Sequence, residues 1–208
     1  MIDCLRESIL YWPGRGQNPE ELSDCLNIFK TNGYFVDVLP YAYDLGDNPV
    51  NPESHIYQWA HAKTQGGSKW WIGLSLGASI AHIVASILPL TSIPNRITLI
   101  NPFANRAQLA QEKKFSLKGQ WPLKPEDFRS SVPTVDLVVS IDDKKIPVEH
   151  ANKLMMLFDG ENRRFIELDA DHAITCRSTQ IELSDILLYG NKNGASKRYA
   201  HIISCNLY

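Results

Sequence analysis

Ser75 lies in a pattern that can make a serine nucleophilic. Residues 73–77 read GLSLG and match the form G-x-S-x-G, in which the serine sits on a sharp turn between a strand and a helix. The two glycines allow neighbouring chains to approach this turn without a side-chain clash. A predicted strand at 69–72, which reads KWWI, precedes the motif, and small residues that suit a tightly packed helix follow it from Ala78. This context favours a nucleophile over the alternative, a glycine-rich turn with an inert serine.

Residues further along the chain supply a base and an acid for that serine. A serine hydroxyl needs an adjacent base, usually a histidine that is oriented by a carboxylate. His172 comes directly after one predicted strand, and the pair Asp142 and Asp143 comes directly after another. Parallel strands would bring both positions to the same edge of the sheet as Ser75. The two aspartates are adjacent and point in different directions, so only one of them can meet the histidine.

The five other histidines are weaker candidates for the base. His55 and His61 precede the serine and lie on an expected amphipathic helix. His82 is seven residues along the nucleophile's own helix, too far to meet the hydroxyl. His150 lies inside a later expected helix, and His201 lies in the C-terminal tail.

Short apolar runs that alternate with helical patterns must position these candidates. Such alternation is typical of strand–helix units and of a parallel sheet. The first helix has start signals at Asn18, Pro19 and Glu21, which fit an N-cap, a first helical position and a capping box. The expected strands are 8–12, 34–39, 69–74, 96–100, 134–141 and 164–168, and the expected helices include 52–63, 75–88 and 172–189.

Composition and charge argue against several other classes of protein. The chain has 208 residues, of which 44% are hydrophobic and 21% charged, as in an ordinary globular domain. Its formal net charge of -2 favours neither a nucleic-acid partner nor an acidic membrane surface. The sequence has no apolar run of transmembrane length and no pattern of a secretory signal, so we expect a cytoplasmic protein.

The cysteines do not indicate a metal or redox site. Cys4, Cys25, Cys176 and Cys205 are far apart and form no C-x-x-C pair. We therefore expect reduced thiols that are mostly buried, no metal and no organic cofactor.

These motifs together resemble the α/β-hydrolase superfamily, in particular its small esterases and thioesterases. The similarity extends from Ser8 to about Leu188 and covers most of the chain. It implies a three-layer α/β sandwich in a minimal form, with a mainly parallel sheet of about six strands flanked by helices. We expect a single domain at 1–190, a lid-like insertion at about 104–129, and a C-terminal tail at 191–208 without an assigned structure.

The resemblance also implies roles for particular residues. The acid of this family usually lies in a G-x-x-D-x-x-V-P segment, and residues 140–147, which read SIDDKKIP, match it with Asp143 as the acid. The implied catalytic triad is Ser75, Asp143 and His172. The implied oxyanion hole consists of the backbone N–H groups of Arg15 and Leu76.

Two positions depart from the family pattern. Pro13 stands where the family usually has a histidine before the glycine that follows the first strand. Asp171 stands where a glycine often precedes the catalytic histidine. Neither change removes a backbone N–H group of the implied oxyanion hole, but each affects the geometry of a loop at the site.

The implied activity is hydrolysis of an ester or thioester through an acyl-enzyme on Ser75, with a small-molecule acyl substrate that is free or linked to a carrier. An acyltransferase on the same scaffold is one alternative. A non-catalytic binding or regulatory protein with a degenerate hydrolase fold is another, from a different class. The natural substrate and the oligomeric state do not follow from the sequence.

The lid-like insertion carries more basic than acidic residues. Its cations could receive an acidic carrier or leaving group, such as the phosphate of a coenzyme A or carrier-protein thioester, or they could form a solvated surface. Its apolar residues could line an acyl pocket or pack inside the lid. The cations are Arg106, Lys113, Lys114, Lys118, Lys124 and Arg129, and the apolar residues are Phe115, Leu117, Trp121 and Phe128.

Overall fold

The central element of the structure, a computed structural model, is a seven-stranded sheet with the strand order β2-β1-β3-β4-β5-β6-β7. The structure describes residues 7–15, 21–40, 43, 48–65, 68–113, 123–159, 162–190 and 200–202. Strands β1 to β6 run parallel, and β7 pairs antiparallel with β6. The strands are β1 (Ser8–Trp12), β2 (Phe35–Val38), β3 (Ser68–Leu74), β4 (Arg96–Ile100), β5 (Thr134–Ser140), β6 (Asn162–Leu168) and β7 (Ala200–Ile202).

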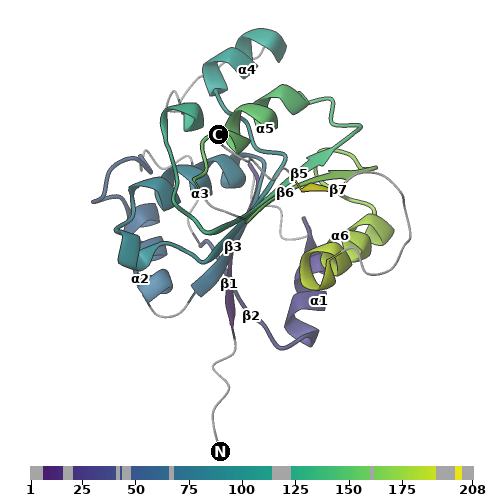
Figure 1. The fold of residues 1–208 in the computed structure, drawn as a ribbon, viewed down its shortest axis with the longest axis horizontal. Helices are drawn as coiled ribbons and strands as arrows, with labels where there is room; N and C mark the ends of the chain where they lie inside the picture. The colour runs from purple at the N-terminus through teal and green to yellow at the C-terminus, as the bar shows by residue number, and fades with distance from the viewer. Residues whose placement is uncertain are drawn as a thin grey trace, which may run out of the picture.

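Helices cover both faces of this sheet, which gives three layers (Figure 1). One face is covered by α1 and α6, and the other by α2, α3 and α5 (Figure 1). The helices are α1 (Ser23–Thr31), α2 (His55–Gln65), α3 (Leu76–Ile87), α4 (Arg106–Lys113), α5 (Val148–Met155) and α6 (Arg177–Tyr189), with short 3-10 turns η1 (Leu90–Ser92) and η2 (Pro125–Asp127). The expected α/β sandwich is confirmed.

Each face of the sheet has its own hydrophobic core. Trp12, Trp71 and Phe158 are fully buried on the side of α2, α3 and α5. Ile9 and Phe29 are fully buried on the side of α1 and α6. The sequence pattern located β1 to β6 to within two residues. The buried strands β1, β3 and β4 are the clearest cases, because strands that are buried on both faces read as nearly continuous apolar runs.

Two helix starts differ from the sequence expectation. Helix α1 begins at Ser23 and not near Pro19, because Leu22 has a left-handed backbone (φ 56°) and the chain turns there. Residues 16–20 lie outside the described part of the chain. Helix α6 begins at Arg177 and not at His172, which instead lies in a turn. The tail without an assignment contributes β7, which extends the sheet beyond β6.

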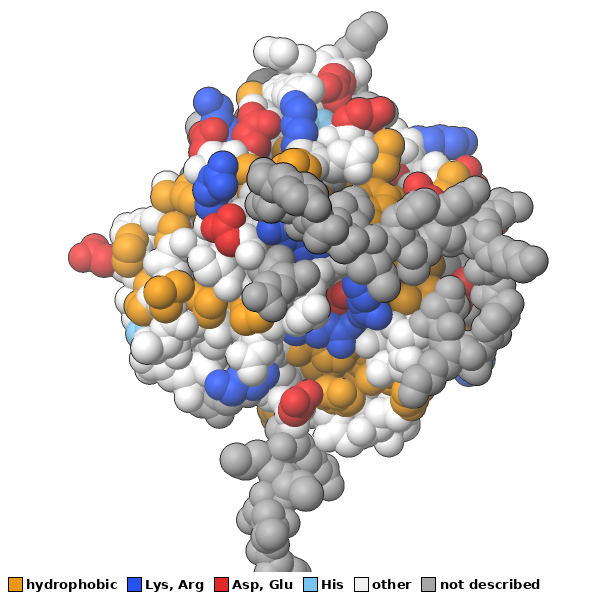
Figure 2. Space-filling view, in the orientation of Figure 1, with side chains coloured by type: hydrophobic (Ala, Val, Ile, Leu, Met, Phe, Trp, Pro, Cys, Tyr) orange, Lys and Arg blue, Asp and Glu red, His pale blue; other side chains and the backbone are white. Residues whose placement is uncertain are grey.

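Charged side chains are distributed without a dominant sign. Figure 2 shows Lys and Arg among Asp and Glu over the visible face, in keeping with the net charge of -2. One charged cluster is buried: Asp136, 0% exposed in the middle of β5, accepts hydrogen bonds from Arg96 (2.7 Å) and Arg164 (2.6 Å). The two guanidinium groups also donate to carbonyl groups of Leu187 and Ile186, so this cluster ties the sheet to the last turn of α6.

Within the described residues, no helix combines the length and the apolar character needed to cross a membrane.

Candidate active site

Ser75 occupies a strained turn between β3 and α3. Its backbone has φ 53° and ψ −117°, a conformation that a residue with a side chain rarely adopts and that costs about 1–3 kcal/mol. The backbone N–H of Ser75 donates to the carbonyl of Ile100 (2.8 Å), and its carbonyl accepts from the N–H of Ser79 (3.2 Å). The turn is therefore held from the neighbouring strand and from the helix, and the hydroxyl stands at the carboxyl end of the sheet.

The two glycines of the motif are required by close backbone contacts. A Cβ on Gly73 would lie 2.5 Å from the Cα of Ala78 in the following helix. A Cβ on Gly77 would overlap the carbonyl groups of Trp12, at the end of β1, and of Pro13, in the loop that follows. Both substitutions would push the nucleophile turn away from its surroundings, because the contacted atoms belong to backbone that cannot move aside.

The structure brings Ser75, His172 and Asp143 into one chain of contacts. Nε2 of His172 lies 2.8 Å from Oγ of Ser75, and Nδ1 lies 2.7 Å from Oδ2 of Asp143. An ionised carboxylate can only accept, so Nδ1–H donates to Asp143 and Nε2 is left to accept the serine proton. These residues follow β3, β5 and β6, whose parallel order places the three carboxyl ends at one edge.

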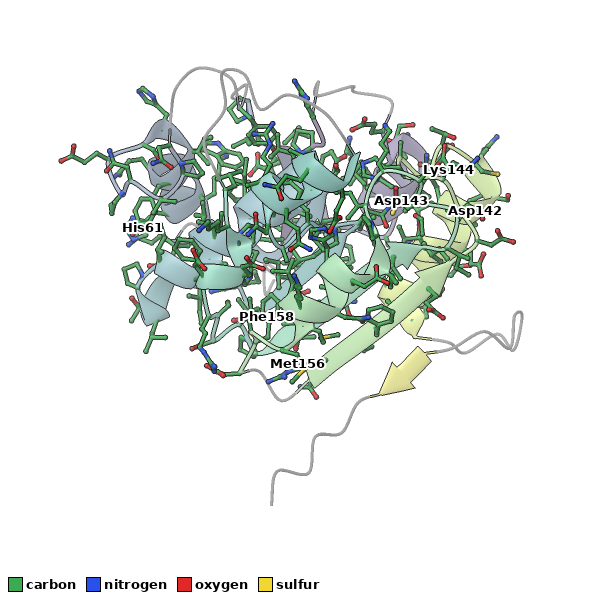
Figure 3. All side chains as sticks on the ribbon, turned by 90° about the horizontal axis from the view of Figure 1, so that it is seen from above. His61, Asp142, Asp143, Lys144, Met156 and Phe158 are labelled. Atoms are coloured by element: carbon green, nitrogen blue, oxygen red, sulfur yellow. The ribbon has the colours of Figure 1, made fainter. Side chains whose placement is uncertain are left out.

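Of the two adjacent aspartates, only Asp143 reaches the histidine. Its side chain is 3% exposed, and Oδ1 accepts from the backbone N–H groups of Lys145 (2.7 Å) and Ile146 (3.0 Å). Burial alone would raise the pKa of Asp143, but the hydrogen bonds and the charge of His172 outweigh it and lower this pKa below its usual value. Asp142 is exposed, and Figure 3 shows both aspartates with Lys144 just beyond the sheet.

Two residues hold the His172 turn: Asn101, which sequence reasoning missed, and Asp171, which it noted only as a departure from the family pattern. Asn101, 3% exposed and with φ 48°, donates from Nδ2 to the carbonyl of His172 and to Oγ of Ser140, both at 2.8 Å. Asp171 accepts from the backbone N–H and the hydroxyl of Thr175 at 2.9 and 2.8 Å. The aspartate in place of the family's glycine thus closes its own local turn. An Asn-Pro pair directly after a buried strand was the available signal for Asn101.

The loop after β1 faces the serine from the other side. The hydroxyl of Tyr43 donates to the carbonyl of Pro13 (2.7 Å), which fixes the residue that replaces the family's histidine. Arg15 and Leu76, the implied oxyanion donors, line the same cavity as Ser75. Leu76 is the first residue of α3, where a backbone N–H has no partner within the helix. No sequence signal pointed to Tyr43.

These groups surround a cavity of about 540 Å³. Ser75 and His172 line it together with apolar side chains that include Phe103, Leu109 and Ile146. Glu21 also lines it, and burial raises the pKa of this carboxyl despite the N–H of Gly14 and the charges of His172 and Lys145, which lower it. A cavity of this size accommodates a small ester beside the serine hydroxyl.

The other histidines whose side chains the structure describes lie away from the serine, and the side chain of His201 lies outside the described part of the chain. His82 is fully buried, and its Nε2–H points to the carbonyl groups of Pro125 and Phe128 at 3.1 Å. Nδ1 of His150 accepts from the backbone N–H of Ala104 (3.1 Å), and its Nε2 lies 3.3 Å from Glu112. Both histidines therefore fasten the segment after β4 to the rest of the fold. His55 and His61 belong to α2, and Figure 3 shows His61 far from the aspartates.

The lid-like insertion is described in part. Its helix α4 places Arg106 and Leu109 on the cavity wall. Arg129 is exposed and lies 3.8 Å from Asp159, which makes it a surface ion pair. Phe128 packs against the core on the side of α3. The side chains of Lys113, Lys114, Phe115, Leu117, Lys118 and Trp121 lie outside the described part of the chain.

The described residues offer no metal site. No group of three or more His, Cys, Asp and Glu side chains among them could hold a metal ion. Cys25 and Cys176 are free thiols, whereas Cys4 and Cys205 fall outside the described residues. Burial raises the pKa of Cys25 to about 12, which makes this thiol inert at neutral pH.

Comparison with known proteins identifies the fold. No family model and no curated protein matches the chain. Among solved structures, it is similar to the esterase domain of a Rhodothermus marinus protein, at 17% identity and a TM-score of 0.67 over 89% of this chain and 86% of that one. It is also similar to a sugar hydrolase from Lactococcus lactis, at 17% identity and a TM-score of 0.64 over 88% of both chains. An esterase of Pyrococcus furiosus is similar at 13% identity and a TM-score of 0.62, over 87% of this chain and 80% of that one. The chain has the α/β-hydrolase fold.

Proposed function

We propose that this protein is a serine hydrolase that cleaves small esters or thioesters through an acyl-enzyme on Ser75. The observation that carries the proposal is the unbroken chain of contacts from Ser75 Oγ to His172 and on to Asp143, beside a cavity. The solved structures of the same fold that are named esterases and hydrolases support the same class of reaction.

The geometry supports the following acylation step. Nε2 of His172 takes the proton of the Ser75 hydroxyl as Oγ attacks the substrate carbonyl. The backbone N–H groups of Arg15 and Leu76 would bind the oxyanion of the tetrahedral intermediate, and a donor of this kind contributes about 3 kcal/mol. The imidazolium then donates its proton to the leaving alkoxide or thiolate, which departs and leaves an ester on Ser75.

Deacylation repeats this chemistry with water. His172 takes a proton from water, the hydroxide oxygen attacks the acyl carbonyl, and Ser75 leaves as its proton returns from Nε2. Asp143 stays ionised throughout, because three groups stabilise its charge: the backbone N–H groups of Lys145 and Ile146, and His172, which acts through both its Nδ1–H and its imidazolium charge. It therefore holds the imidazole in the tautomer that can accept the serine proton.

Labelling with a fluorophosphonate tests the proposal directly. This probe phosphonylates only a serine that is activated by a base, and we expect one adduct on Ser75. Ser75→Ala abolishes the adduct and the hydrolysis of p-nitrophenyl butyrate. Ser86→Ala is the matched control, because Ser86 lies on the same helix and its hydroxyl only binds the carbonyl of His82.

Two outcomes would contradict the proposal. Absence of labelling in the folded wild type would indicate that the fold serves binding and not catalysis. Labelling that persists in Ser75→Ala would place the nucleophile elsewhere.

A further inference from the structure

The cavity beside Ser75 has a charge opposite to that of the whole chain. Among the described residues, one carboxylate lines it, that of Glu21. Four permanently or normally cationic side chains line it as well: Arg15, Arg106, Lys144 and Lys145. The chain as a whole carries a formal net charge of -2, so the positive excess is local to this cavity. A concave site of one sign concentrates ligands of the opposite sign.

Arg106 differs from the other three cations in its burial. It is 5% exposed, whereas Arg15, Lys144 and Lys145 are exposed. Its main chain is held at the start of α4, because its backbone N–H donates to the backbone carbonyl of Leu123 (2.9 Å). The guanidinium is charged at all physiological pH values, and its five N–H donors can serve a protein acceptor and a ligand at the same time.

The surroundings of Arg106 suit one part of a substrate. Phe103 and Leu109, which are three residues before and three residues after Arg106, are both buried and line the same cavity with apolar side chains. An acyl chain would lie on such a wall, whereas a leaving group departs toward solvent. Lys144 and Lys145, which follow the triad aspartate, also line the cavity, but both side chains are exposed to solvent. The buried cation therefore lines the cavity together with apolar side chains that fit the acyl part of a substrate.

We propose that the site selects acyl groups that end in a carboxylate, that is, half-esters or half-thioesters of short dicarboxylic acids. Arg106 binds the terminal carboxylate through its planar fork, and the exposed lysines attract the anion to the opening. This inference rests on the proposed acyl transfer at Ser75. It makes Arg106 a specificity residue that contacts the substrate without taking part in bond cleavage.

A pair of esters of equal chain length measures this selectivity. Mono-p-nitrophenyl glutarate carries the terminal carboxylate, and p-nitrophenyl pentanoate replaces it with a methyl group. We expect the ratio of their kcat/KM values to be at least about 10 in the wild type, and to approach 1 in Arg106→Gln, mainly through KM for the glutarate. Arg106→Lys keeps the charge but loses the fork, so an intermediate ratio is expected.

Arg129→Gln is the matched control, because this exposed insertion arginine only forms a surface ion pair. It should keep the wild-type ratio. A wild-type ratio near 1 would overturn the proposal, and so would an equal loss for both esters in Arg106→Gln. A preference for an anionic leaving group, measured with acetyl-coenzyme A against S-ethyl thioacetate, without one for the glutarate would also overturn it.

Equilibrium binding separates this inference from the proposed function. The Ser75→Ala protein cannot form an acyl-enzyme, so the affinity for monomethyl glutarate, measured by calorimetry, reports on the carboxylate site alone. We expect the Kd to rise about 30-fold when Arg106→Gln is added. Binding that depends on Arg106 in a protein that hydrolyses no ester would refute only the proposed function. Hydrolysis of both esters with no such binding would refute only the carboxylate site.

Discussion

Replacement of Asp143 by asparagine exchanges one carboxylate oxygen for an amide NH2 group, and the hydrogen bonds around this side chain predict how the exchange affects hydrolysis. Oδ1 of the aspartate is held by two backbone N–H groups, at 2.7 and 3.0 Å. In Asp143→Asn the amide oxygen is expected to take the place of Oδ1, because only an oxygen can accept from these two N–H groups. The amide nitrogen must then face Nδ1 of His172. Two donors cannot share this contact, so the imidazole is forced to accept at Nδ1 and to carry its proton at Nε2.

A histidine with its proton on Nε2 cannot accept the proton of Ser75, which lies 2.8 Å away. Loss of the correct tautomer in a serine triad lowers kcat by about 10⁴-fold, which corresponds to about 5.5 kcal/mol. We expect this loss in Asp143→Asn for the hydrolysis of p-nitrophenyl butyrate near pH 7.5. The fold should persist, because the amide oxygen keeps both backbone hydrogen bonds.

Asp142→Asn is the control for this experiment, since the two aspartates are neighbours and only one contacts the histidine. The exposed Asp142 should tolerate the change with less than about a twofold effect. A loss below tenfold in Asp143→Asn, with normal thermal unfolding, would refute the assignment of Asp143 as the orienting acid. A large loss in Asp142→Asn would transfer that role to its neighbour.

Three further predictions concern the backbone and the titratable groups around the site. Gly77→Ala should remove fluorophosphonate labelling and lower the melting temperature, because the methyl group would overlap two carbonyl groups; normal labelling would contradict the close approach. Burial lowers the pKa of His82 to about 4 from 6.5, so wild-type stability should fall by about 3 kcal/mol as pH drops from 6.5 to 4. His82→Gln, which keeps an N–H donor but does not titrate, should show a flatter urea-unfolding profile. The raised pKa of Glu21 means that its ionisation costs stability, so Glu21→Gln should stabilise the protein at neutral pH, and this advantage should shrink as the pH falls through the raised pKa and vanish below the ordinary value of 4.5. The exposed Glu53→Gln should show no such dependence.

Local sequence patterns were sufficient where a single segment decides its own structure. The six parallel strands lie within two residues of where the sequence predicted them, and the clearest apolar runs belong to β1, β3 and β4, which are buried along most of their length. The turn at Ser75 lies where GLSLG predicted it, because Gly73 allows the close approach of Ala78 within the same segment.

Patterns were less informative where distant segments compete for one stretch of chain. Asn18 to Glu21 read as a helix start, yet α1 begins at Ser23 and Glu21 lines the cavity, where it lies close enough to His172 and Lys145 for their charges to act on it. A start signal describes only local hydrogen bonds, and it says nothing of groups brought near by the fold. The turn at His172 was assigned to a helix for the same reason, because its hydrogen bond to Asn101 connects residues 71 positions apart.

The order of residue types along the chain was enough to nominate Ser75, His172 and one of the adjacent pair Asp142 and Asp143, of which the family resemblance implied Asp143, and to favour an α/β sandwich. Only the tertiary structure decided which aspartate faces the histidine, that Tyr43 and Asn101 hold the two loops beside the serine, and that Arg106 is a buried wall of the cavity. Sequence patterns record which segments must be apolar and which turns need glycine. Distances between side chains depend on how strands pair and helices pack, and pairing joins residues that are far apart in the chain.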